Sequence, residues 1–252
     1  MGDFNSISFY NQDGSKKTRE EFVAEISSLY DSYSTPPPID YLAVCTGEES
    51  QVNVDATLKT YNFISKSITI DGEITQETAK NVVEQIRFWN SVNECYETGP
   101  IVIYINSEGG DLNATLSIIG AIEISSVPVY TVNIGRAWSG GFMILVSGHK
   151  RFAIPYSTYL FHEGSNCIIG DAHKTIQEME FYQHQLNVIK QIILDNTDID
   201  EELYESHAKD DWWLENKFAL TYGIIDSVID NFEDFRKEEA EEDEGEYTEK
   251  QE

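Results

Sequence analysis

The chain has 252 residues, of which 40% are hydrophobic and 12% aromatic, which is enough to form a buried core in one large or two small domains. Its formal net charge of −28 argues against a nucleic acid or an anionic membrane as a partner, because both are polyanions. No apolar run is long enough to cross a bilayer, and the first residues lack the apolar segment of a secretion signal.

Three cysteines bear on the location of the protein. Cys45, Cys95 and Cys167 are widely spaced and match no metal-ligand pattern. A sparse, odd set of cysteines is typical of reduced thiols in the cytoplasm. We therefore expect a cytoplasmic protein that holds no metal ion.

The two ends of the chain differ in composition from the middle. Residues 18–33 place apolar side chains on one face of a predicted helix, and prolines at 36–38 end it. We therefore expect residues 1–55 to form an extension, a helix followed by a proline-rich linker. The last fifteen residues are mostly acidic and have no apolar periodicity, which predicts a disordered, solubilising tail over residues 236–252.

Between these ends, predicted strands alternate with predicted helices. Such alternation is typical of an α/β fold with largely parallel strands. The predicted strands cover residues 67–74, 100–105, 127–134, 151–154 and 157–161. The predicted helices cover residues 78–89, 111–124, 139–147 and 171–194.

A pair of glycines lies where the predicted strand 100–105 leads into the next helix. The segment reads YINSEGGD, with Gly109 and Gly110 directly before Asp111. Glycines at such a junction allow close backbone approach and leave N–H groups free for an anion or a developing oxyanion. The same pair also occurs in ordinary tight turns, and no nucleotide-binding glycine pattern is present.

Ser139 and His162 occupy similar junctions. Ser139 lies between an apolar strand and a helix, where a serine either caps the helix or serves as a nucleophile at a strand-to-helix turn. His162 is the one histidine of five that follows an apolar strand. By itself, it would be interpreted as a histidine hydrogen-bonded to a neighbouring backbone group.

Four motifs, taken in order, resemble the proteolytic subunit of the Clp protease, a self-compartmentalised serine peptidase with a ClpP/crotonase fold. They are INSEGG at 105–110, GRAWSG at 135–140, LFHEGS at 160–165, and DWWLENKFALTYGIID at 211–226. The resemblance runs from about Ser67 to Asp230. It implies a peptidase domain over residues 56–235, with repeated ββα units, a largely parallel sheet and flanking helices.

The resemblance also implies the roles of individual residues. Ser139 corresponds to the nucleophile, His162 to its general base, and Asp211 to the acid that orients the histidine. The backbone N–H groups of Gly110 and Gly140 fall where the family builds its oxyanion hole. A serine needs a base to take its proton, and that base needs an acid, which we expect to be buried, to fix its tautomer.

The implied function is a serine endopeptidase that cleaves unfolded polypeptides inside an oligomeric chamber. The family resemblance implies two stacked seven-membered rings of this chain and a separate AAA+ unfoldase that consumes ATP. The chain has no phosphate-binding loop of its own, which fits the use of ATP by a separate partner. Nothing in the sequence implies a metal or a cofactor, and we expect neither.

Some positions depart from the family pattern and indicate a divergent member. Trp138 replaces a small residue before Ser139, so either the wall beside the serine is reshaped or the ring points away. Gly140 replaces a methionine, Glu108 replaces a proline, and 163–164 read Glu-Gly in place of Gln-Pro.

Two other functions stay open. A crotonase-like acyl-CoA hydratase or isomerase has the same fold but needs no Ser-His-Asp set. A catalytically degenerate subunit that regulates the chamber would explain Trp138 and the acidic tail. We expect Trp212 and Trp213 to pack on the histidine-bearing strand rather than to bind substrate.

Overall fold

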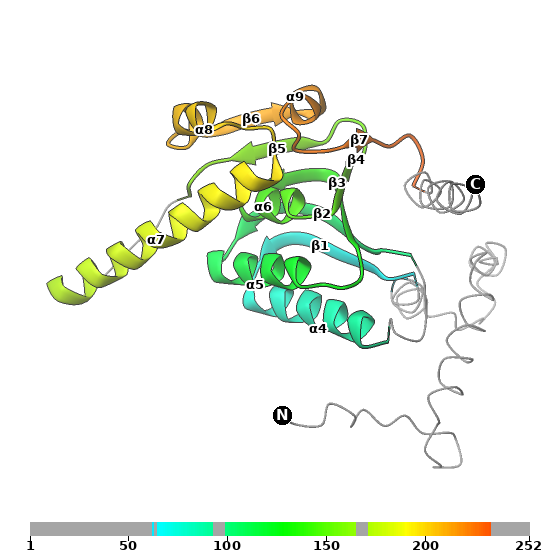
Figure 1. Ribbon diagram of the computed structural model, residues 1–252, viewed down its shortest axis with the longest axis horizontal. Coiled ribbons are helices and arrows are strands. Elements are labelled where there is room, and N and C mark those ends of the chain that lie inside the picture. The colour runs from blue at the N-terminus through cyan, green and yellow to red at the C-terminus, as the bar shows by residue number, and fades with distance from the viewer. Residues whose placement is uncertain (1–61, 63–64, 93–98, 165–170, 233–252) are drawn as a thin grey trace, which may run out of the picture. The chain divides into compact units, whose positions relative to one another are not determined.

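The computed structural model describes residues 62, 65–92, 99–164 and 171–232 (Figure 1). The predicted extension over residues 1–55, the predicted tail over 236–252, and Cys45, Cys95 and Cys167 lie outside the described residues. The chain divides into two units, and the unit that carries Ile68–Ser91 and the residues from Thr98 onward contains the elements below. The boundaries of the peptidase domain, 56–235, stay a prediction.

A seven-stranded sheet forms the centre of this unit, in the order β1-β2-β3-β4-β7, with β5 paired to β3 and β6 paired to β5. The pairs β2–β3, β3–β4, β3–β5 and β4–β7 are parallel, and β5–β6 is antiparallel. The largely parallel α/β sheet predicted from the alternation of elements is therefore confirmed. The strands are β1 (Ser67–Ile74), β2 (Ile101–Gly110), β3 (Val129–Trp138), β4 (Lys150–Ala153), β5 (Thr158–Phe161), β6 (Trp212–Glu215) and β7 (Ser227–Val228).

The sheet forks at β3. The first half of this strand, from Tyr130 to Asn133, pairs with β4, and its last three residues, from Arg136 to Trp138, pair with β5. Both β2 and β3 run beyond the apolar segments that predicted them, since the two strands still pair at Ser107 and Ala137, after a shift of register between Ile105 and Ser107. Pairing with a neighbouring strand, rather than apolar composition, sets these strand ends.

The described helices are α4 (Gln76–Val92), α5 (Leu112–Glu123), α6 (Gly140–Val146), α7 (Ala172–Asn196), α8 (Glu201–His207) and α9 (Asn216–Thr221). Helix α6 follows β3 directly and packs against β2 and β3, and all seven of its residues are buried. Helix α5 begins after Asp111, whose side chain accepts a hydrogen bond from the N–H of Ala114 and so caps the helix. Neither the long helix α7 nor any other described helix is apolar over a length that would span a bilayer.

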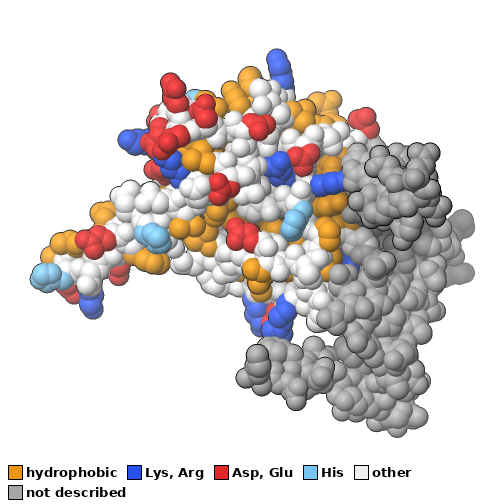
Figure 2. Space-filling view, in the orientation of Figure 1, with side chains coloured by type: hydrophobic (Ala, Val, Ile, Leu, Met, Phe, Trp, Pro, Cys, Tyr) orange, Lys and Arg blue, Asp and Glu red, His pale blue; other side chains and the backbone are white. Residues whose placement is uncertain are grey.

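Helix α7 is only half covered by the described chain. Ile189, Ile192 and Ile193 near its C-terminus are buried. In the N-terminal half of the same helix, Ile176 and Met179 are 56% and 55% exposed. This half extends away from the other elements in Figure 1, and Figure 2 shows hydrophobic side chains along it. Within the described residues, nothing therefore covers most of the surface of these two apolar side chains.

A row of aromatic side chains joins three elements in the core. The rings of Phe142 on α6 and Phe161 on β5 lie 5.6 Å apart, and those of Phe161 and Tyr204 on α8 lie 5.3 Å apart. All three side chains are almost fully buried. Because Phe161 is the last residue of β5, this packing fixes the position at which the next residue, His162, leaves the strand.

We expect Phe142→Ala to lower the free energy of unfolding by about 3–5 kcal/mol, because it removes a buried ring and leaves a cavity. Urea denaturation followed by circular dichroism would measure this. Phe218→Ala, which truncates a ring that is 45% exposed on α9, is the matched control and should cost less than about 1 kcal/mol. Equal costs for the two variants would contradict the importance of the buried row.

Candidate active site

Ser139 lies at the junction of β3 and α6 in an unusual backbone conformation. Its φ of 51° and ψ of −116° fall outside the regions that non-glycine residues normally occupy. Its hydroxyl makes no capping hydrogen bond to α6, although it directly precedes that helix. Its backbone N–H donates to the carbonyl of Leu160 on β5, at 2.8 Å. The alternative in which Ser139 serves as a helix cap is therefore wrong.

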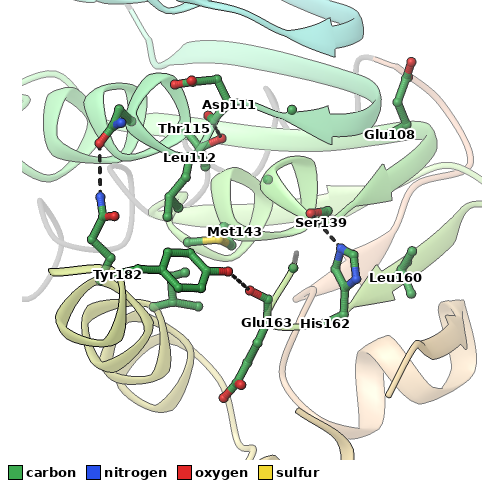
Figure 3. A pocket seen from close by; sticks show the side chains of 16 residues that line it. Glu108, Asp111, Leu112, Thr115, Ser139, Met143, Leu160, His162, Glu163 and Tyr182 are labelled. Carbon is green, nitrogen blue, oxygen red and sulfur yellow. Dashed lines mark hydrogen bonds between the residues drawn. The ribbon is translucent and has the colours of Figure 1, made fainter. Parts of the chain in front are cut away.

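The side chain of His162 faces Ser139. Its Nε2 atom lies 3.0 Å from the hydroxyl oxygen of Ser139 (Figure 3). The residue after it is held on two sides, since the N–H of Glu163 donates to the carbonyl of Ala208 and its carbonyl accepts from the hydroxyl of Tyr182. Burial and the nearby Glu163 carboxylate raise the pKa of Tyr182, which keeps this hydroxyl protonated as a donor.

Asp211 lies on the other side of the His162 ring. One of its carboxylate oxygens is 3.3 Å from Nδ1 of His162. The antiparallel pairing of Phe161 with Trp212 explains this contact, because the residues next to a paired position in two antiparallel strands also face each other. The Asp211 side chain is 60% exposed, so the expectation of a buried acid is wrong. The physical reason is that β6 pairs only with β5 and forms an edge of the described sheet.

Three positions near Ser139 leave no room for a side chain, and all three are glycines. A Cβ atom on Gly109 would lie 2.7 Å from the Cβ of Ser139, and one on Gly110 would lie 2.3 Å from the carbonyl oxygen of Ile74. A Cβ on Gly140 would lie 2.5 Å from the hydroxyl oxygen of Thr115. Gly110 and Gly140 line the same cavity as Ser139. The sequence did not predict that Gly109 contacts Ser139. The positive φ of Gly109 is a sign of such close packing, but it is known only from the structure.

A cavity of about 530 Å³ opens beside Ser139 and His162. Apolar side chains from α5, α6 and α7 form one wall, namely Leu112, Met143 and Ile189. Gln185 on α7 donates to Asn113 on α5 and bridges the two helices at this wall. The lining includes three carboxylates and, within the described part of the chain, no lysine or arginine; the carboxylates are those of Glu108, Asp111 and Glu163.

The ring of Trp138 does not line this cavity. Its Nε1–H donates to the hydroxyl of Thr158, and its ring packs edge-to-face against Trp213 at 5.0 Å. Of the two alternatives for this residue, the structure therefore supports a ring that points away. Strand β6 carries both neighbouring tryptophans onto β5, as predicted; Trp212 is buried against His207, whereas Trp213 is 54% exposed.

Among residues 62, 65–92, 99–164 and 171–232, no three or more histidine, cysteine or acidic side chains gather in a way that could hold a metal ion. The expectation that the chain uses no metal and no cofactor stays a prediction. The contacts at this site are those of a serine, a histidine and an acid arranged in series.

A family model, curated relatives and a solved structure that resemble this chain all point to the Clp protease family. A family model described as Clp protease matches residues 51–232. The chain is 32% identical to the ATP-dependent Clp protease proteolytic subunit 2 of Treponema denticola, over 75% of this chain and 95% of that protein. It is 31% identical to the ATP-dependent Clp protease proteolytic subunit of Leuconostoc citreum, over 64% and 82%. A ClpP1 point mutant from Listeria monocytogenes has a similar structure, with a TM-score of 0.62, 27% identity, and coverage of 70% of this chain and 98% of that one.

We expect Gly109→Ala to destabilise the protein by about 1–3 kcal/mol, because the new methyl group meets Ser139 and the positive φ disfavours alanine. Gly120→Ala is the matched control, since a Cβ atom there meets nothing within 4 Å inside helix α5. That variant should be more stable by about 0.5–1 kcal/mol. Thermal denaturation of both variants would test the difference, and a neutral Gly109→Ala would contradict the close packing.

Proposed function

Because the chain belongs to the Clp protease family, we propose that it is a serine-type endopeptidase, the proteolytic subunit of an ATP-dependent Clp-type protease. The observation that carries this proposal is the series of contacts from Ser139 to His162, at 3.0 Å, and from His162 to Asp211, at 3.3 Å. The cavity at the serine supplies space for a substrate beside these groups.

The geometry fits acyl transfer. With Nδ1–H of His162 donating to Asp211, Nε2 is free to accept the proton of the Ser139 hydroxyl. The serine oxygen then attacks the carbonyl carbon of the peptide bond, and the histidine passes the proton to the leaving amine. Water hydrolyses the resulting ester through the same base and releases the second product.

We propose that the oxyanion formed during each step accepts hydrogen bonds from the backbone N–H groups of Gly110 and Gly140. Both glycines line the cavity with Ser139, and Gly140 is the first residue of α6. The first N–H groups of a helix have no partner within that helix, so they are suited to a developing negative charge.

The substrates in this proposal are unfolded polypeptides that a separate AAA+ unfoldase delivers by consuming ATP, and the chain itself needs no cofactor. The proposed location is the cytoplasm. The proposed assembly is two stacked seven-membered rings of this chain. The exposed apolar side chains on the projecting half of α7 support an assembly, because a second copy would cover them.

Two observations argue against the other functions. An acyl-CoA carries phosphate groups, and the described lining of the cavity presents carboxylates without a lysine or arginine to bind them. A degenerate subunit would not need the contacts that link Ser139, His162 and Asp211.

The experiment that tests the proposal is labelling of the purified protein with a fluorophosphonate, followed by mass spectrometry to find the modified residue. We expect an adduct on Ser139 that is lost in His162→Ala, because only an activated serine reacts at a useful rate. An adduct on another serine would show that the site is wrong. An assembled protein without any adduct would favour the degenerate subunit.

Ser139→Ala should abolish peptide hydrolysis, because no other group at the site replaces the attacking oxygen. Cleavage of an unfolded protein such as casein, followed by gel electrophoresis, would measure this. Native mass spectrometry should show the same number of subunits in the variant and in the wild type, namely that of the proposed stacked rings. If the Ser139→Ala variant hydrolysed peptides at the wild-type rate, Ser139 would not be the nucleophile.

Asp211→Asn should lower turnover on the order of 10⁴-fold, because an amide can stabilise the wrong tautomer of His162 and cannot stabilise its protonated form. Asp210→Asn changes the neighbouring exposed acid and is the matched control. It should change turnover less than about twofold, since Asp211 is the acid at His162. Similar losses in both variants would reassign the effect to general electrostatics.

A further inference from the structure

A row of three side chains crosses the sheet next to the nucleophile. Trp138 on β3 pairs with Leu160 on β5, and Leu160 pairs with Trp213 on β6. Directly paired residues of neighbouring strands project from the same face of a sheet. Trp138, Leu160 and Trp213 therefore share one face, and the two indole rings pack edge-to-face with centroids 5.0 Å apart.

This row is continuous with the site described above. Trp138 directly precedes Ser139, and the carbonyl of Leu160 accepts the hydrogen bond from the serine N–H. Asp211 and Trp213 are two residues apart and both exposed, with buried Trp212 between them, so they lie on the same face. The row thus begins at the serine and ends beside the acid.

The row borders the cavity through its central residue, Leu160, whereas neither indole ring is part of the lining. Leu160 and Glu108 line the cavity. Figure 3 shows both of them on one side of the Ser139–His162 pair, and Met143 and Tyr182 on the other. A polypeptide that crosses the serine and continues past Leu160 would leave the cavity beside Trp213, which pairs with Leu160 and is exposed.

Trp138 is held rigidly as the base of the row. Its Nε1–H is bonded to Thr158, and the Arg136 guanidinium lies 5.3 Å from its ring centroid. Arg136 in turn contacts the Glu108 carboxylate at 2.8 Å. Arg136 thus occupies the place where a substrate cation would stack on Trp138, and it pairs with Glu108. What the row offers to a ligand is the exposed ring of Trp213, 54% accessible and supported by Trp138.

We propose that Trp213, packed on Trp138, forms a subsite that binds an aromatic side chain of the polypeptide substrate close to the scissile bond. This inference rests on the proposed peptidase function and adds a specificity to it. Aromatic pairs prefer the offset and edge-to-face arrangements that an exposed, supported indole ring allows. A rigid ring also loses little conformational freedom when a substrate binds to it.

The test uses internally quenched peptides of one parent sequence, in which each residue within three positions of the scissile bond is changed in turn to Phe, Ala or Lys. At one position we expect the assembled wild-type protein to cleave the Phe peptide about fivefold faster than the Ala peptide in kcat/KM. Trp213→Ala should reduce this ratio to about one. Trp213→Phe, which keeps an aromatic ring, should preserve most of the ratio.

Phe218→Ala is the control, because it removes another exposed aromatic ring, 45% accessible on α9, and should leave the Phe-to-Ala ratio unchanged. A ratio that stays at its wild-type value in Trp213→Ala, or a preference for Lys over Phe that this variant removes, would overturn the aromatic subsite. Loss of assembly in Trp213→Ala and Trp213→Phe, seen by native mass spectrometry, would also overturn it by showing that a second copy covers the ring. If the wild type cleaves no peptide and Ser139 takes no fluorophosphonate, the proposed function itself fails.

Discussion

The hydrogen bond from the backbone N–H of Ser139 to the carbonyl of Leu160 is the contact on which the site depends. It continues the parallel pairing of β3 with β5, and β5 in turn pairs with β6. These two pairings bring residues 139, 162 and 211 together from three segments of the chain. If β5 were displaced by one residue relative to β3, the side chains at the end of β5 would change faces, and His162 would point away from the serine.

Close backbone packing is the second constraint. The region around Ser139 excludes side chains at three glycines, so β1, β2 and the start of α6 approach each other more closely than other residues would allow. The serine itself adopts a strained backbone conformation. Such strain persists only where the surroundings fix it. The fully buried helix α6 and the ring of Phe142 within it provide that support.

The two sides of the cavity differ in how they are held. On one side, strand pairing and the packing of Trp138 on Trp213 make a rigid surface within one chain. On the other side, α7 contributes Tyr182, Gln185 and Ile189 to the lining, while its N-terminal half extends without cover from the described residues.

The class of fold, the positions of the main strands and helices, and the motifs around Ser139 and His162 could be predicted from the amino-acid sequence, because apolar periodicity and short motifs are local properties of the chain. The sequence also pointed to Asp211, through the spacing to a motif near the end of the domain. Three features could be seen only in the folded chain: Asp211 is exposed, the hydroxyl of Ser139 does not cap α6, and the two neighbouring tryptophans separate into one buried and one exposed ring. These features depend on which strand lies at the edge of the sheet and on the register between strands. Both are set by contacts between residues far apart in the chain, which no local pattern records.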